Sequence, residues 1–332
     1  MHRLSRNPLL NRRQLLAALG ASALVGCGLR GGPAKQMRGA FIIAATPYKD
    51  APGKPIDFDD LTGEVDFLDR CGVQGMVWPQ MASEFSSLTK DERMQGMEAL
   101  AKAAKGKKPA LVLGVQAPNQ AEMLEYAAHA EKLEPDAVIA MPPSEATSLD
   151  EYKAYYTALC KLAKRPVFIQ TTGGAKDLEP PVEMIVELAR EFKNFGYVKE
   201  EAKPVIERLT ELAKYRPDPI KTVFSGAAGK GWTYEMRLGF DGTMPGAMFA
   251  DVYALLWELH EKGDLDQLRE VFSKLLLMIN LDQQIPGVRN YTFQKRGIFK
   301  TSISRRGDYS WTDAQKAEID WNLEGLRPYF RV

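Results

Sequence analysis

The amino-acid sequence predicts an α/β fold, a (β/α)₈ TIM barrel followed by a C-terminal helical extension. Two observations favour this fold. From residue 38 onward, short and continuously apolar runs alternate with amphipathic stretches, a pattern typical of a parallel sheet covered by helices. Eight units of this kind fill about 210 residues, which fits a closed barrel.

The apolar runs that we expect to form the strands are residues 40–45, 73–79, 110–115, 137–141, 167–171, 196–199, 222–225 and 242–247. Helical periodicity between them is clearest at residues 59–70, 90–105, 120–133, 148–163, 181–192 and 203–214. Further helical patterns at residues 249–261, 265–280 and 312–327 predict the C-terminal extension. A doubly wound open sheet is the alternative. It would normally carry a glycine-rich phosphate loop after its first strand, where this chain has Thr46-Pro47-Tyr48.

Residues 1–35 are predicted to be an export signal and tether rather than part of the fold. Several arginines precede a charge-free run, residues 15–27, which is too short to span a membrane. Asn11-Arg12-Arg13-Gln14 resembles a twin-arginine signal, and Leu24-Val25-Gly26-Cys27 resembles the bacterial lipobox. We therefore expect lipidation at Cys27 and an exported chain, periplasmic or at the outer face of a membrane. An amphipathic N-terminal helix with a chance cysteine is the alternative.

The rest of the chain is predicted to divide into barrel residues 36–250 and C-terminal helices 251–332. Its 332 residues carry 44 Lys and Arg against 43 Asp and Glu, a near-neutral balance that gives no support for nucleic-acid binding. The chain has three histidines and three cysteines without metal-ligand spacing, so we expect no metal site and no cofactor. Cys71 and Cys160 are expected to be buried thiols.

Function in a barrel gathers at the carboxyl ends of the strands. Among the residues predicted there, only Lys199 is a nucleophile that can form an imine with a carbonyl group. Burial would favour its neutral amine, which is the reactive form. The structural alternative is a salt bridge from Lys199 to Glu84, Glu200 or Glu201.

The chain resembles the dihydrodipicolinate synthase / N-acetylneuraminate lyase family of class I pyruvate aldolases. The resemblance runs from about residue 39 to at least residue 246 and rests on the order and spacing of short segments. These are Thr46-Pro47-Tyr48, Gly72-Val73-Gln74-Gly75, Glu84-Phe85, Leu88-Thr89, Glu92-Arg93, Gly114-Val115, Asp136-Ala137-Val138, Pro142-Pro143, Val198-Lys199-Glu200 and Ser225-Gly226. The resemblance implies a homo-oligomeric barrel, a dimer or tetramer, in which Lys199 forms a Schiff base with pyruvate or another 2-keto acid.

The sequence departs from this family at two important places. The loop that holds the keto-acid carboxylate falls on Gln80-Met81-Ala82-Ser83-Glu84, where only the glutamate is retained. The family's strand-five tyrosine, a proton relay, falls on Gln170, which can form hydrogen bonds but is neither an acid nor a base at accessible pH. Tyr48, Glu84 or Glu201 could rebuild the relay. For Tyr48 and Glu84 the plainer interpretations are a pocket wall and a support for the loop, and for Glu201 a bystander role is an equal alternative.

We therefore predict Lys199 and Gln170 as the catalytic pair. The residues predicted to bind substrate are Thr46, Met81, Ala82, Ser83, Glu84, Thr171 and Gly226. The favoured function is a lyase or aldolase that acts on pyruvate or another 2-keto acid. The alternative is a lipid-anchored, non-catalytic binding or sensing protein on the same barrel, and a weaker one is a dehydratase or hydrolase that uses Lys199 with other 2-keto acids.

Overall fold

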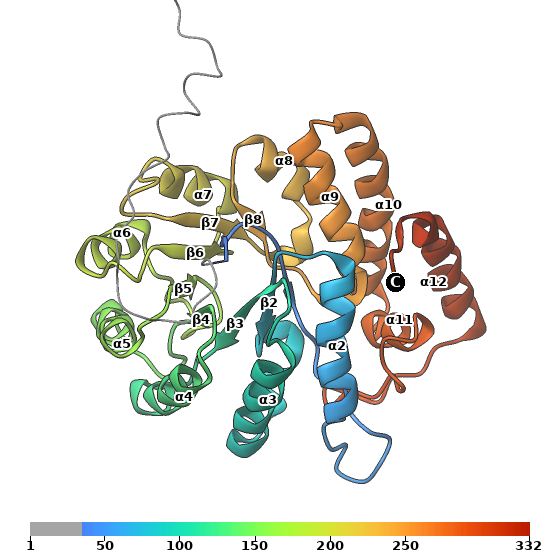
Figure 1. Cartoon of the computed structure of the whole chain (residues 1–332), viewed down its shortest axis with the longest axis horizontal. Coiled ribbons are helices and arrows are strands. Elements are labelled where there is room, and N and C mark those ends of the chain that lie inside the picture. The colour runs from blue at the N-terminus through green and yellow to red at the C-terminus, as the bar shows by residue number, and fades with distance from the viewer. Residues whose placement is uncertain (1–34) are drawn as a thin grey trace, which may run out of the picture. The chain divides into compact units, whose positions relative to one another are not determined.

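The computed structural model describes residues 35–332, and within them eight parallel strands close into a barrel (Figure 1). Each strand pairs with the next, and the first pairs with the last. The strands are β1 (Gly39–Ile43), β2 (Gly75–Trp78), β3 (Ala110–Gly114), β4 (Ala137–Ala140), β5 (Val167–Gln170), β6 (Tyr197–Glu200), β7 (Thr222–Ser225) and β8 (Gly242–Thr243). The predicted barrel is confirmed, and the open sheet is excluded.

Helices surround the barrel and extend beyond it. Those between the strands are α2 (Phe58–Cys71), α3 (Lys90–Ala103), α4 (Gln120–Leu133), α5 (Leu149–Leu162), α6 (Val182–Glu191), α7 (Val205–Ala213) and α8 (Trp232–Arg237). After β8 come α9 (Ala250–Lys262), α10 (Leu265–Gln284), α11 (Val288–Lys295) and α12 (Asp313–Leu326). Helix α9 packs against β1 and α2, so it completes the ring of helices around the strands.

Short 3₁₀ turns occupy several of the connections. They are η1 (Met81–Ser83), η2 (Phe85–Ser87), η3 (Ala227–Gly229), η4 (Ala247–Phe249) and η5 (Arg327–Tyr329). Of these, η1 and η2 follow β2, and η3 follows β7. They therefore lie at the carboxyl ends of the strands.

Local sequence explains where several helices begin. Thr89 caps α3, because its side chain accepts the Glu92 backbone N–H while the Glu92 carboxylate accepts the Thr89 N–H. Asp57 caps α2, because its side chain accepts two backbone N–H groups. Gly72 ends α2 with φ of 80°, the left-handed conformation that glycine adopts at lowest cost.

Aromatic side chains fill the interior of the barrel below the site. The ring centroids of Phe41 and Phe224 lie 5.0 Å apart, and those of Phe168 and Phe224 lie 5.7 Å apart. Glycines make room for these rings, because a Cβ at Gly75 would lie 2.4 Å from Phe41 and one at Gly242 would lie 2.5 Å from Phe224. Two residues beyond Phe168, the inward position of β5 becomes polar at Gln170.

Three further findings concern the two cysteines, the last strand and the length of the helices. Cys71 and Cys160 are buried free thiols, as expected. Strand β8 is shorter than the predicted run 242–247, because Pro245 lacks the N–H that would continue the ladder. None of the helices in residues 35–332 is long and apolar enough to cross a membrane.

Candidate functional site

Lys199 lies at the carboxyl end of β6 with its side chain inside the mouth of the barrel. Only 3% of the residue is exposed. Its Nζ donates a 2.9 Å hydrogen bond to Oε1 of Gln170, the residue directly opposite it on β5. The same nitrogen lies 3.2 Å from Oε2 of Glu201. The predicted pair of Lys199 and Gln170 is therefore in direct contact, and Glu201 joins it.

Glu201 is held in place by the two connections around it. Its Oε1 accepts a 2.8 Å hydrogen bond from the backbone N–H of Ala227, and its Oε2 accepts one of 3.3 Å from the Thr172 hydroxyl. Burial alone would raise the pKa of Glu201. The positive charge of Lys199 and the Ala227 N–H outweigh that effect, so its pKa lies below its ordinary value. Glu201 is thus a carboxylate at neutral pH.

Thr171 lies on the other face of the strand wall. Its hydroxyl donates a 2.5 Å hydrogen bond to Oε1 of Glu200 and accepts the backbone N–H groups of Glu201 and Ala202. Glu200 in turn pairs with Arg208 at 3.1 Å. Because neighbouring residues of a strand face opposite sides, this cluster is separate from Lys199 and stabilises the β5 and β6 ends.

The loop after β2 is fastened to the barrel by its own polar groups. Thr46 Oγ1 donates to the backbone carbonyl of Ser83 at 2.6 Å, and Ser83 Oγ donates to that of Ala44 at 2.5 Å. The Ser83 hydroxyl also accepts the Gln80 N–H. The hydroxyls of Thr46 and Ser83, which were predicted to bind substrate, therefore already have partners within the protein.

Glu84 and Met81 point in different directions from this loop. The Glu84 carboxylate accepts the Ser304 hydroxyl at 2.7 Å and the Arg305 N–H at 3.1 Å, which ties the loop to the C-terminal region. The Met81 sulfur accepts a 3.8 Å hydrogen bond from Nε2 of Gln170. Met81 thus lies directly beside the Lys199–Gln170 pair, and half of its surface is exposed.

Tyr48 does not fit the role of a rebuilt proton relay. Its hydroxyl shares a 3.0 Å hydrogen bond with Ser87, and its ring lies under the Arg305 guanidinium at 4.7 Å. Burial raises the pKa of Tyr48 to about 12, which makes it a poor acid near neutral pH. It serves as a wall that supports the loops.

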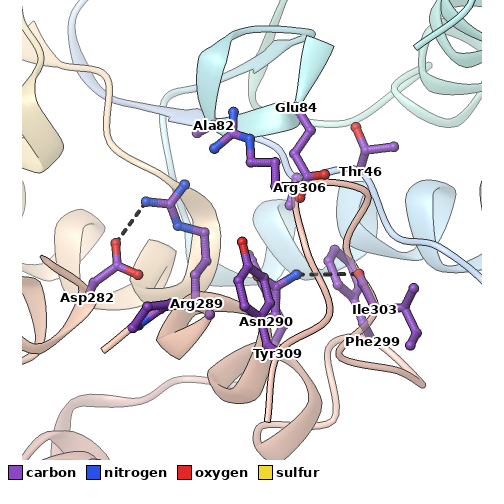
Figure 2. A pocket seen from close by; sticks show the side chains of 14 residues that line it. Thr46, Ala82, Glu84, Asp282, Arg289, Asn290, Phe299, Ile303, Arg306 and Tyr309 are labelled. Carbon is purple, nitrogen blue, oxygen red and sulfur yellow. Dashed lines mark hydrogen bonds and ion pairs between the residues drawn. The ribbon is translucent and has the colours of Figure 1, made fainter. Parts of the chain in front are cut away.

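A cavity of about 230 Å³ opens between the barrel mouth and the C-terminal region (Figure 2). The barrel contributes Thr46, Ala82 and Glu84, which sequence analysis had predicted at the site. The C-terminal region contributes residues that sequence analysis missed, namely Asp282, Arg289, Asn290, Phe293, Phe299, Ile303, Arg306 and Tyr309. The only signal for them was the pair Arg305-Arg306 in an otherwise weakly patterned stretch.

No group of three or more His, Cys, Asp or Glu side chains in residues 35–332 is arranged to hold a metal ion.

Known proteins resemble the chain over most of its length. Residues 36–318 match the model of the dihydrodipicolinate synthetase family. The 4-hydroxy-tetrahydrodipicolinate synthase of Chlorobium phaeobacteroides is 25% identical over 279 residues, which cover 80% of this chain and 89% of the relative. A DapA-like lyase of Pyrococcus abyssi is 24% identical over 236 residues, covering 70% of this chain and 77% of that one.

Solved structures show the same fold. The dihydrodipicolinate synthase of Rhodopseudomonas palustris aligns with a TM-score of 0.76 at 24% identity, covering 87% of this chain and 97% of that one. The 4-hydroxy-tetrahydrodipicolinate synthase of Methylacidiphilum fumariolicum aligns with a TM-score of 0.78 at 16% identity, covering 89% of this chain and 97% of that one. Because the family model spans the barrel and most of the C-terminal helices, this chain belongs to the dihydrodipicolinate synthetase family.

Proposed function

We propose that the chain is a lyase or aldolase that forms a Schiff base between Lys199 and pyruvate or another 2-keto acid. The observation that carries this proposal is the buried Lys199 amine at the barrel mouth, 2.9 Å from Gln170 and 3.2 Å from the Glu201 carboxylate. A lysine amine in this position is directed at the barrel mouth, where it can attack a bound carbonyl group. Membership of a family whose named relatives include lyases supports the same chemistry.

Glu201 takes the part that the family assigns to tyrosine. Its carboxylate accepts a proton from the Lys199 ammonium, and the neutral amine attacks the carbonyl carbon of the 2-keto acid. After a proton moves from nitrogen to oxygen, the hydroxyl of the carbinolamine takes the proton held by Glu201 and leaves as water. The products are an iminium ion on Lys199 and a regenerated carboxylate. Gln170 accepts a hydrogen bond from the amine and orients it, without transferring protons.

Trapping with borohydride tests the proposal. The full chain is incubated with pyruvate and a panel of other 2-keto acids and then reduced, and the adduct is mapped by mass spectrometry. We expect one adduct on Lys199 that is absent in Lys199→Ala and unchanged in Lys230→Ala, a control at an exposed lysine near the barrel mouth. Glu201→Gln should slow adduct formation by about 100-fold, in the range of general acid–base catalysis. The absence of any adduct across the panel would sink the proposal.

One observation favours the second candidate, a non-catalytic binding or sensing protein. The hydroxyls of Thr46, Ser83 and Thr171 are all engaged within the protein, and Lys199 is paired with an acid. Such a protein would bind a 2-keto acid, seen as a rise in melting temperature, without forming an adduct that borohydride traps. The same incubations therefore separate the two functions.

A further inference from the structure

The cavity between the barrel mouth and the C-terminal region holds two arginines that the proposed chemistry does not use. Arg289 comes from α11, and Arg306 comes from the connection between α11 and α12, which we call the α11–α12 connection (residues 296–312). Figure 2 shows Arg289 and Arg306 reaching the cavity from these two segments. Arginine is the side chain best suited to hold a carboxylate, because its planar fork can donate two parallel hydrogen bonds.

The two guanidinium groups lie on either side of the β1 end. A Cβ at Gly246, just after β8, would lie 3.7 Å from the Arg289 guanidinium carbon. Arg306 donates to the backbone carbonyl of Met81, just after β2. These contacts follow β8 and β2, the two strands that pair with β1, and Thr46 after β1 lines the same cavity. The groups therefore converge at the barrel mouth instead of facing bulk solvent separately.

The hydrogen bonds within the structure leave donors free in this cavity. Arg289 is oriented by Asp282 at 2.9 Å, and its Nε is buried without a partner among the described residues. Arg306 makes no ion pair with any acid in residues 35–332. The one other acid in the cavity wall, Glu84, is occupied by the Ser304 hydroxyl and the Arg305 N–H. Unpaired donors of this kind match a carboxylate that enters from outside.

The size and the walls of the cavity limit what it can hold. About 230 Å³ lies below the usual range for a whole ligand or cofactor, so the space fits the end of a small acid. Phe293, Phe299 and Ile303 form an apolar side that suits methylene groups. A charged end against the arginines and a short carbon chain against this wall describe the end of a small carboxylic acid.

Met81 connects the cavity to Lys199. Its carbonyl oxygen accepts from Arg306, and its sulfur contacts Gln170, which holds the Lys199 amine. One residue thus touches both the arginine cavity and the imine-forming pair. We propose that Arg289 and Arg306 bind the second carboxylate of a 2-keto dicarboxylic acid whose keto group reacts at Lys199. The keto part of this inference rests on the proposed function, whereas the carboxylate site does not.

Equilibrium binding tests the carboxylate site alone. Succinate, which has no keto group, is titrated into the full chain by calorimetry. We expect binding that Arg306→Met and Arg289→Met each weaken at least tenfold. Methionine keeps most of the apolar stem, so the variants remove the charge with little loss of packing. Arg269→Met, at an exposed arginine on α10, is the matched control and should bind normally.

Trapping then tests the connection to Lys199. We expect Arg306→Met to reduce the borohydride-trapped adduct of 2-oxoglutarate at least tenfold, while the adduct of pyruvate, which lacks a second carboxylate, stays within twofold. The inference would be overturned if Arg306→Met reduced the adducts of 2-oxoglutarate and pyruvate equally. It would also be overturned if neither arginine substitution weakened succinate binding. If succinate binds through the arginines but no acid gives an adduct, the proposed Schiff-base function fails and the carboxylate site stands. If pyruvate gives an adduct and the arginines have no effect, only the inference fails.

Discussion

Gly226 is a position where the site requires the absence of a side chain. A Cβ there would lie 1.9 Å from Oε1 of Glu201 and 2.3 Å from its carboxyl carbon. The same Oε1 accepts the Ala227 N–H that holds the carboxylate beside Lys199. Sequence analysis assigned Gly226 to substrate binding, and its place in the structure indicates a positioning role through Glu201.

Gly226→Ala is therefore expected to push Glu201 away from Lys199. The crowding should lower the free energy of unfolding by about 1–3 kcal/mol, and the displaced carboxylate should slow adduct formation at least tenfold. Denaturant unfolding and timed borohydride trapping measure the two effects. Gly63→Ala is the matched control, because a Cβ at this exposed position on α2 meets nothing within 4 Å. A Gly226→Ala chain that forms adduct at the normal rate would contradict the positioning role.

Some residues of the site could be predicted from the sequence, whereas the hydrogen-bond partners of others could not. Lys199 was predicted as the one nucleophile at a strand end, and Gln170 as the residue at the resembling family's strand-five tyrosine position; the β5–β6 register places the two opposite each other. Thr46 and Ser83 were expected to face substrate, but their hydroxyls bond to backbone carbonyls. Those bonds follow from the tight η1 turn, which ends in Glu84 at φ of 57°. Such a conformation depends on tertiary contacts and leaves no pattern in the sequence.

Among the elements, the α11–α12 connection is fixed to the barrel mouth mainly by Arg305. Its guanidinium pairs with Glu92 at 2.6 Å, donates to the backbone carbonyls of Lys54 and Ser87, and covers the Tyr48 ring. Glu92 also accepts the backbone N–H of Thr89, the residue that caps α3. One carboxylate thus supports the start of a barrel helix and the wall of the arginine cavity together.

The Glu92 carboxylate should give stability that depends on pH. The hydrogen bond from Arg305 lowers the pKa of Glu92 from 4.5 to about 2. A lowered pKa means that the stabilisation is present above pH 4.5 and is lost as the pH falls toward 2. We expect Glu92→Gln to reduce the free energy of unfolding at pH 7 by about 2 kcal/mol, a modest value because both partners are partly exposed.

Urea unfolding at several pH values measures this difference. The difference in the free energy of unfolding between the natural chain and Glu92→Gln should become steadily smaller below pH 4.5. Asp91→Asn is the control on the same first turn of α3, since Asp91 makes no ion pair among the described residues. A difference in the free energy of unfolding that stays constant as the pH falls would show that the charge of the Glu92 carboxylate does not contribute to stability.

The elements that sequence analysis recovered best are those with long periodic patterns. Helix α4 was predicted at its observed bounds, and the other long helices differ by a few residues. Helices α8 and α11 were missed, because six and eight residues are too few to show a clear 3.6-residue period. Since α11 supplies Arg289, the same weakness concealed the arginine cavity.

For the molecule as a whole, the untested part of the sequence prediction is where the protein resides. Cys27 and the twin-arginine-like segment lie outside the described residues, 35–332. We propose that the chain is exported and anchored by acyl groups on Cys27, and that it assembles as a homo-oligomer.

Detergent phase separation of cells that produce the full chain tests the anchor. We expect the natural chain in the detergent phase and Cys27→Ser in the aqueous phase, because the acyl chains supply the affinity for lipid. Cys71→Ser should partition like the natural chain, since Cys71 is a buried thiol of the barrel. Equal partitioning of the natural chain and Cys27→Ser would rule out the lipid anchor.

The packed rings of Phe41, Phe168 and Phe224 restrict how small molecules can enter and leave the barrel. They fill its interior on the amino-terminal side of Lys199, so the barrel is open to small molecules only at the opposite end. Reactants and products must share that one opening, which Met81 and the α11–α12 connection border. If the proposed Schiff base forms, a fragment still joined to Lys199 departs last, after any partner fragment that lies nearer the opening. In the proposed reaction, the order in which products leave would follow from which end of the barrel the three phenylalanines close.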